Sequence, residues 1–485
     1  MDVFDAVVVG AGPAGCLVGR RLADAGLDVA LFEAGNGVKP PEVSSWDATR
    51  AASQPSWYWD NLVAVTGNGQ PVTYRAGRGL GGGSAVNYMV LSAGASADYH
   101  RDSGPTQGSA TRDVAPIVGQ LLDQIKPTVP EYGPLAKAIG GSIARAGDQV
   151  VLGIQPEVGY WETQTSAGFD VLGFVPVLMA GANGVRRSAA EVFLADAPSN
   201  LVVCPNTEVS TVVVSPDGCV EGVAVVGENG LRHVLARTVV LCGGTIHNPA
   251  LLVRSGLLAP GTRLEVMDHP SFSFVAQLGL GAGGNPDYDG GSPSVSAMYR
   301  WMATQPGRGA ITSLVADNVG VGDDGLTYGA VIMTLDCPRS VGYLVASSAS
   351  GGELVPGWLD HADDKNEMVA GVRYLADFLL SPDVVGPGGP VDAWFVDDKG
   401  TKLKELIDRG DAAMGRWLVS HPGPVAHLVG SCAGLVQGAL SEVLSAAGLH
   451  IIDGSVLSQV PSGPPQLPIM VKAERVAGRL VASLQ

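Results

Sequence analysis

A glycine-rich turn near the N-terminus constrains the fold of this chain more than any other feature. Residues 7–9 are consecutive valines, as expected of a parallel strand that is buried on both faces. Gly10, Gly12 and Gly15 follow with the spacing G-x-G-x-x-G, and a helical pattern comes next. Glu33 lies 18 residues after Gly15, at the end of a second apolar run, where a carboxylate holds ribose hydroxyls. The segment therefore predicts a dinucleotide-binding unit, and Glu33 favours FAD or NAD over NADP.

Composition limits the partners that the chain binds. The 485 residues include 30 Lys and Arg against 47 Asp and Glu, a formal net charge of −17. Phosphate backbones and anionic membrane surfaces are bound by clustered Lys and Arg, and the sequence holds no such cluster. We therefore predict no nucleic-acid partner. A negative field fits a small uncharged or cationic ligand.

The sequence predicts a cytoplasmic protein. Its N-terminus lacks the basic segment of a signal peptide. Because no run reaches the ~20 apolar residues of a membrane helix, we expect no transmembrane segment. The six cysteines are scattered without a C-x-x-C pair, which argues against a structural zinc site and is typical of a reducing compartment.

Periodicity and turn residues predict the later elements. In chain order they are an irregular stretch at 40–76, a helix at 133–147, strands at 201–203, 209–214, 220–226 and 234–240, a sheet within 270–360, mainly helices in 361–420, a strand at 450–452 and a final helix at about 467–484.

Six further segments resemble, in the same order, the motifs of one enzyme family. They are Gly77 to Met89 (GRGLGGGSAVNYM), Arg187 to Ala190 (RSAA), Gly243 to Pro249 (GGTIHNP) with Ser255-Gly256, Asp268-His269-Pro270, His427 to Cys432 (HLVGSC), and Asp453-Gly454-Ser455 with Ala473-Glu474-Arg475. The chain resembles the glucose–methanol–choline (GMC) oxidoreductases, and its short length is typical of a compact bacterial member. The resemblance covers the whole chain except roughly 270–420.

This resemblance implies an α/β plus α+β architecture, with a discontinuous, doubly wound FAD-binding domain and a substrate domain built on an antiparallel sheet. The expected boundaries are 1–125, 183–269 and 421–485 for the FAD-binding domain, and 126–182 and 270–420 for the substrate domain.

The resemblance also implies FAD as the cofactor. Some relatives bond the flavin to a His or Cys near the first motif, but residues 77–89 contain neither, so we expect non-covalent FAD. The expected cofactor-binding residues are Gly10, Gly12, Ala14, Gly15, Glu33, Arg78, Gly81, Gly82, Ser84, Asn87, Val209 and Asp453.

His427 aligns with the catalytic His of the family, whose members transfer hydride from an alcohol carbon to flavin N5 while a base takes the hydroxyl proton. A neutral imidazole suits that base. His421 is the rival, and His269 matches a position usually regarded as structural. Most relatives carry a second His or an Asn where this chain has Pro464, which has no polar side chain. Gln466 is the candidate replacement.

Several functions stay open on these residues. The leading prediction is oxidation of a small-molecule alcohol, with oxygen, a quinone or another carrier as electron acceptor. The alternatives are an electron-transfer flavoprotein that reoxidises a reduced cofactor or partner, as in the mycofactocin-associated type, a lyase that keeps FAD structurally, and a binding protein without catalysis. Candidates for pocket lining or core packing are Tyr299, Trp301, Tyr328, Trp358 and Trp394.

Overall fold

The valines at 7–9 lie in β1 (Val3–Val9), which runs parallel to its neighbours β2 and β13 on either side. The structure is a computed structural model that describes residues 3–100, 110–148, 150, 172–227, 230–279, 293–304, 309–322, 324–349 and 352–485. In this first sheet the strand order is β10 (Leu201–Cys204), β2 (Val29–Phe32), β1, β13 (Gly230–Leu241), β24 (Leu449–Ile451), β23 (Glu442–Val443) and β22 (Val436–Gln437). β11 (Glu208–Val214) and β12 (Val220–Gly227) extend it as an antiparallel hairpin on β13.

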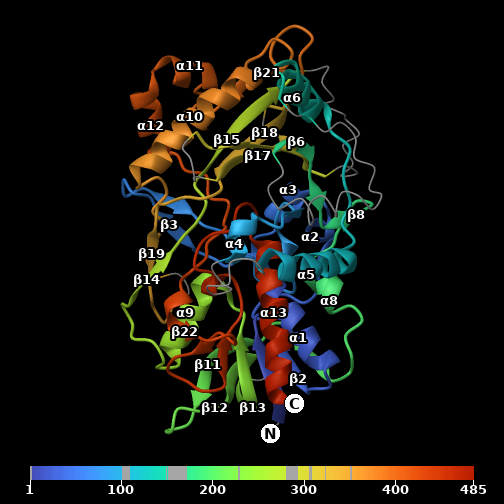
Figure 1. The fold of residues 1–485 in the computed structure, drawn as a ribbon, viewed down its shortest axis with the longest axis vertical. Helices are drawn as coiled ribbons and strands as arrows, with labels where there is room; N and C mark the ends of the chain where they lie inside the picture. Colours follow the sequence, from blue (N-terminus) through green and yellow to red (C-terminus); the bar gives the residue numbers. More distant parts are fainter. Residues whose placement is uncertain are drawn as a thin grey trace.

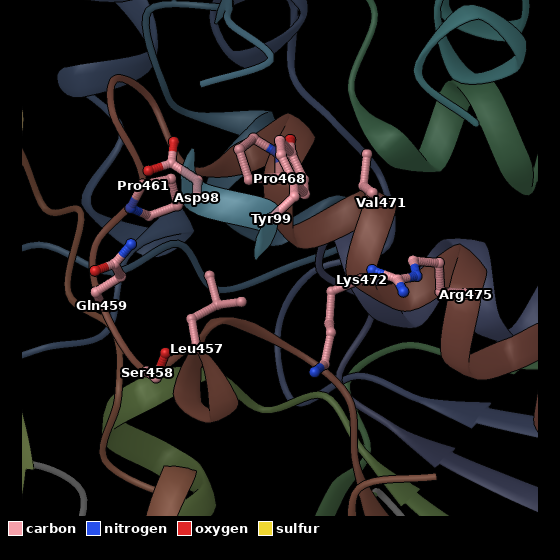
Figure 2. Close-up of a pocket in the computed structure, with 10 residues that line it drawn as sticks. All are labelled: Asp98, Tyr99, Leu457, Ser458, Gln459, Pro461, Pro468, Val471, Lys472 and Arg475. Carbon is pink, nitrogen blue, oxygen red and sulfur yellow. The ribbon is translucent and has the colours of Figure 1, made fainter. Parts of the chain in front are cut away.

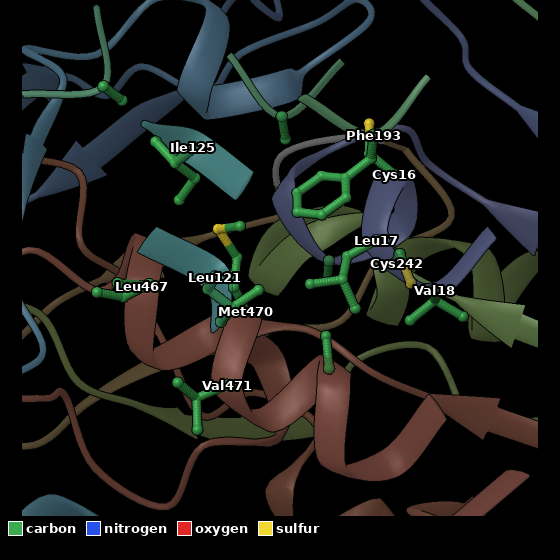
Figure 3. Packing of buried hydrophobic residues seen from close by; sticks show 14 of the residues in the cluster. Cys16, Leu17, Val18, Leu121, Ile125, Phe193, Cys242, Leu467, Met470 and Val471 are labelled. Atoms are coloured by element: carbon green, nitrogen blue, oxygen red, sulfur yellow. The ribbon is translucent and has the colours of Figure 1, made fainter. Parts of the chain in front are cut away.

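Helices cover the first sheet because its central strands are apolar. α1 (Pro13–Asp24) packs against α13 (Gln466–Leu484), so the first and last helices lie side by side (Figure 1). The apolar side chains that join α1, α5 (Ala110–Ile125) and α13 in this core include Cys16, Leu17, Val18, Leu121, Ile125, Leu467, Met470 and Val471 (Figure 3). The helix predicted at the C-terminus is thereby confirmed and closes the domain that the N-terminus begins.

A second sheet is antiparallel and lies at the opposite end of the molecule (Figure 1). Its order is β21 (Val391–Phe395), β15 (Ser271–Leu278), β18 (Thr327–Leu335), β17 (Ala310–Val321), β16 (Val295–Met302) and β6 (Gly173–Pro176). The apolar side chains of one face pack on α10 (Ala362–Leu379) and α12 (Asp411–Ser420). Hydrophobic burial therefore fixes that face and leaves the other toward the first sheet. The predicted architecture of a parallel sheet plus an antiparallel sheet is confirmed, whereas the domain boundaries stay a prediction.

A third sheet joins segments that are far apart in sequence. Its order is β14 (Arg263–Val266), β19 (Gly342–Val345), β20 (Leu354–Val355), β3 (Val63–Val65) and β4 (Pro71–Thr73). The short pairs β5 (Val90–Leu91) with β7 (Leu178–Met179), and β8 (Gly181–Ala182) with β9 (Val185–Arg186), complete the described strands. The other described α-helices are α2 (Pro41–Ser44), α3 (Ala48–Ala52), α4 (Ser96–His100), α6 (Pro134–Arg145), α8 (Ala189–Phe193), α9 (Gly244–Arg254) and α11 (Leu403–Asp408).

One sequence-based expectation needs correction, and another is confirmed with an addition. Residues 40–76 are not irregular, since they contain two short helices and a hairpin of three-residue strands. Elements this short span too few residues to show a period of 3.6 or 2. The stretch at 361–420 is mainly helical, as predicted. It also contains β21, which pairs with β15 as the edge strand of the second sheet. That strand is stabilised by its neighbour rather than by its own sequence.

Gly15 and Gly19 of α1 offer a matched test of the packing between helix and strand. A Cβ on Gly15 would lie 1.8 Å from the Gly10 carbonyl oxygen, whereas a Cβ on Gly19 would meet Leu201 Cδ1 at an ordinary 3.5 Å. We expect Gly15→Ala to lower the free energy of unfolding by at least ~1–3 kcal/mol through overpacking. Gly19→Ala should cause no loss, because Ala favours a helix over Gly. Urea unfolding followed by tryptophan fluorescence measures both, and equal midpoints for the two variants would contradict the packing argument.

Candidate functional site

A cavity of about 610 Å³ extends from the glycine turn after β1 to the exposed face of the antiparallel sheet. Most of the predicted site residues line it, and these are Gly10, Gly12, Ala14, Glu33, Gly82, Ser84, Asn87, Val209, His427, Asp453 and Gln466. The cavity thus brings together motifs from the first, middle and last parts of the chain.

Two glycine loops form a bare-backbone cradle at one end of this cavity. A Cβ on Gly82 would lie 2.7 Å from Gly12 Cα, and Gly81 N donates a hydrogen bond of 2.8 Å to Ala11 O. A Cβ on Gly12 would meet no atom within 4 Å, so its backbone faces open space. Gly12 is also the N-cap of α1, where free N–H groups and the helix dipole favour an anion. The cradle fits the pyrophosphate of a dinucleotide.

Gly15, Arg78 and Gly81 do not line the cavity wall, although the sequence predicts them as cofactor-binding. Gly15 packs α1 against Gly10, and Gly81, in the left-handed region at φ +96°, lies against Ser188. Arg78 donates from Nη2 to Ala34 O at 3.3 Å and lies over the Trp59 ring. These residues shape the cradle rather than face its interior.

Two buried carboxylates hold the loops of the cradle. Glu33 accepts hydrogen bonds from Ala11 N at 2.8 Å and Gly35 N at 2.9 Å, while burial raises its pKa. Asp453 accepts from Gly244 N at 2.7 Å and Asn248 Nδ2 at 2.8 Å, and burial raises its pKa as well. Burial of such groups is tolerated because backbone and amide donors surround them.

A hydrogen-bonded chain connects the glycine motif to the start of α13. Arg186, only 1% exposed, donates from Nη1 to Asn87 O at 2.6 Å and to Asn87 Oδ1 at 2.9 Å. Asn87 Nδ2 in turn donates to Gln466 Oε1 at 2.7 Å. Burial lowers the pKa of Arg186 to about 10, so it stays charged at neutral pH. The sequence singles out Asn87 and Gln466 but misses Arg186, which stands just before the RSAA motif.

His427 is half-buried in the cavity wall and lies against a second histidine. Its Nδ1 is 2.9 Å from Nδ1 of His269, a residue with no exposed surface. Asp268 Oδ1 accepts the backbone N–H of both histidines at 2.9 Å, and its Oδ2 accepts Tyr74 OH at 3.0 Å. Burial lowers the pKa of His269 to about 4 and that of His427 well below 6.5. Both rings are therefore neutral at pH 7. The rival His421 is not on the cavity wall, since it stacks on Trp417.

The far wall of the cavity is the open face of the antiparallel sheet. Ser271 and Thr312 lie on either side of Thr334 in adjacent strands, so three hydroxyl-bearing side chains form one row. Asp336 follows at the end of β18, buried and paired with Arg300 at 3.0 Å. The motifs of the sequence do not reveal this wall, although the alternation Ser-Phe-Ser-Phe at 271–274 has the period of 2 of a strand with one buried face.

The five aromatic residues predicted as pocket or core candidates lie outside the cavity wall. None of Tyr299, Trp301, Tyr328, Trp358 and Trp394 is among the described residues of the cavity wall. Tyr299 and Trp394 are buried with α10 and α12, and Trp358 stacks against Tyr74. The aromatic residues on the wall include Tyr58, Trp59, Tyr74 and Tyr88, and Trp59 stacks on His247 with ring centroids 4.0 Å apart.

A smaller cavity beside α13 is too small for a ligand. Its volume is about 30 Å³, room for little more than water, between Asp98 and the loop that precedes α13 (Figure 2). Asp98 accepts hydrogen bonds from Ser462 N at 2.8 Å and Ala95 N at 2.7 Å. Asp98 thereby fixes the loop that leads through Pro464 to Gln466, the first residue of α13, in the wall of the large cavity.

Comparison with known proteins identifies the family. The chain matches the family described as GMC oxidoreductase over residues 4–271 and again over 338–473. The 5-(hydroxymethyl)furfural oxidase of Methylovorus sp. (strain MP688) is 24% identical over 99% of each protein. The pyridoxine 4-oxidase of Microbacterium luteolum is 22% identical, over 98% of this chain and 99% of that protein.

Solved structures share the fold. The pyridoxine 4-oxidase from Mesorbium loti has a TM-score of 0.80 at 20% identity and matches 98% of each chain. Formate oxidase has a TM-score of 0.82 at 18% identity, over 99% of this chain and 98% of that chain. No helix within the described residues is long and apolar enough to cross a membrane. The chain belongs to the GMC oxidoreductases, a family of enzymes in which FAD is the typical cofactor.

Proposed function

We propose that this enzyme oxidises an alcohol CH–OH group with non-covalent FAD and with His427 as the general base. The observation that carries the proposal is that a neutral histidine and a bare glycine cradle line one continuous cavity. Relatives named as 5-(hydroxymethyl)furfural oxidase and pyridoxine 4-oxidase favour an alcohol as the substrate. FAD, when bound, supplies the hydride acceptor.

The residues of this chain handle the substrate and its proton. His427 accepts the hydroxyl proton because its ring is uncharged at the working pH. Gln466, held in the cavity wall by Asn87, is the second polar group proposed to contact the substrate, in place of the side chain that Pro464 lacks. The row of Ser271, Thr334 and Thr312 is proposed to bind polar groups of the substrate distal to the reacting carbon.

Non-covalent attachment is supported by the nucleophiles near the cradle. Cys242 lines the cavity beside Gly10, but its thiol donates to Ile452 O at 3.2 Å, and burial raises its pKa well above the usual range. A protonated, hydrogen-bonded thiol is a poor nucleophile. The glycine motif at residues 77–89 holds neither a His nor a Cys.

His427→Ala should retain FAD but slow anaerobic flavin reduction by an alcohol by roughly 10²–10⁴, the usual contribution of one general base. The matched control is His421→Ala, six residues away and outside the cavity wall, which should reduce at the wild-type rate. Stopped-flow absorbance measures reduction without involving the acceptor, whether that is oxygen, a quinone or another carrier. Equal rates for His427→Ala and wild type would refute the assignment. A wild-type flavin that no alcohol bleaches would favour the lyase or binding role.

The pH dependence of the same step follows from the lowered pKa of His427. Only the neutral ring accepts a proton, and the pKa lies well below 6.5, so the base form persists into mildly acidic solution. We expect the rate of flavin reduction to stay constant on acidification through pH 6.5 and to fall only at lower pH. Circular dichroism at each pH controls for unfolding. A fall in the rate of flavin reduction with its midpoint at or above pH 6.5 would contradict the lowered pKa of His427.

Acid precipitation tests how the cofactor is held. Because residues 77–89 contain no His or Cys and the Cys242 thiol is protonated, the yellow colour should move entirely into the supernatant. Flavin absorbance of the washed pellet is the measurement, with a covalently flavinylated protein carried through the same steps as control. Colour retained in the pellet would contradict non-covalent binding.

A further inference from the structure

The contact between His269 and His427 restricts where their protons lie. The two Nδ1 atoms are 2.9 Å apart, and the ring planes meet at 81°. Two N–H groups cannot donate to each other, and two lone pairs repel. A hydrogen bond at this distance therefore requires that one Nδ1 carries the proton and the other accepts it.

The hydrogen-bond partner of His269 Nε2 decides whether His269 Nδ1 donates to His427 or accepts from it. Its Nε2 lies 3.1 Å from the backbone oxygen of Asp336, and a carbonyl oxygen can only accept. His269 Nε2 therefore carries a proton. The ring is neutral at pH 7 and holds one N–H, so its Nδ1 is the bare nitrogen. His427 Nδ1 must then be the donor, and the Nε2 of the same neutral ring is left without a proton.

We propose that His269 is a positioning residue that fixes His427 in the tautomer whose Nε2 is free to accept a proton. The inference rests on the proposed function in assigning that Nε2 to the substrate hydroxyl. The opposite tautomer would place an N–H at Nε2, which cannot act as a base.

The surroundings hold both histidines in this arrangement. Asp268 Oδ1 accepts the backbone N–H groups of both His269 and His427, which holds the two segments side by side. Asp336, whose carbonyl orients His269, is itself fixed, since its carboxylate accepts from Arg300 Nε at 3.0 Å and Thr312 Oγ1 at 2.9 Å. The hydrogen-bond chain thus runs from the antiparallel sheet, through His269, to His427.

Histidine ¹⁵N NMR of the oxidised holoenzyme reads the tautomers directly and does not depend on turnover. The chain has eight histidines, and the signals of the pair are assigned by their loss in His269→Asn and His427→Ala. We expect His427 to show a protonated Nδ1 and an unprotonated Nε2, with the reverse for His269. A protonated Nε2 on His427 in the wild-type protein would overturn the proposal.

A matched pair of variants tests the consequence. Asn at position 269 presents Oδ1 near the place of the lost Nδ1, whereas Leu has nearly the same shape without an acceptor, and both lose the bond to Asp336. His269→Leu should mix the two tautomers of His427 and slow flavin reduction by about 10- to 100-fold, the scale of one buried hydrogen bond, at unchanged substrate Kd. His269→Asn should restore the single tautomer and most of the rate.

The outcomes separate this inference from the proposed function. Equal slowing of both variants with an unchanged His427 tautomer would make His269 merely structural. A wild-type enzyme that shows the expected tautomers but is reduced by no alcohol would refute the proposed function and leave the positioning role standing. If His269→Leu does not fold, the wild-type spectrum and His269→Asn still decide.

Discussion

The close approach of two bare backbones, at Gly12 and Gly82, is the constraint on which the site depends. Their loops come so near that one added Cβ would lie 2.7 Å from the facing Cα, and the bond from Gly81 N to Ala11 O joins the same loops. This contact closes one end of the cavity and leaves the N-terminus of α1 open to it. A side chain on Gly82 would force the loops apart, whereas one on Gly12 would enter the open space of the cradle.

Buried carboxylates then tie distant segments to that cradle. Glu33 holds the first turn, Asp453 holds the start of α9, and Asp268 holds the two histidine segments. Each accepts backbone N–H groups, so each organises a loop that no regular sheet or helix would fix. A carboxylate in such a position tolerates burial only while these donors stay in place, which makes the loops mutually dependent.

The sequence predicts the outline of the site better than its interior. The glycine motifs, Glu33 and His427 are recognisable because each belongs to a short contiguous pattern, and the structure gathers them around one cavity. The hairpin at 63–73 and the strand β21 are missed, since three to five residues carry too little pattern and need a neighbouring strand to form. The aromatic residues of the middle region pack in the core, where burial of their large apolar surface is most favourable.

Three features are readable from the sequence alone, namely the parallel strands with their glycine cradle, the candidate base and the lack of a polar side chain at residue 464. The glycine cradle follows from local spacing and residue type, and the candidate base follows from the resemblance of residues 427–432 to a family motif, so neither needs knowledge of distant contacts. The pairing of His269 with His427, 158 residues apart, and the row of hydroxyls on the wall of the same cavity appear only in the folded structure. Which nitrogen of a neutral imidazole carries its proton depends on the partners of both nitrogens. Those partners are assembled only when the parallel sheet and the antiparallel sheet fold against the same cavity.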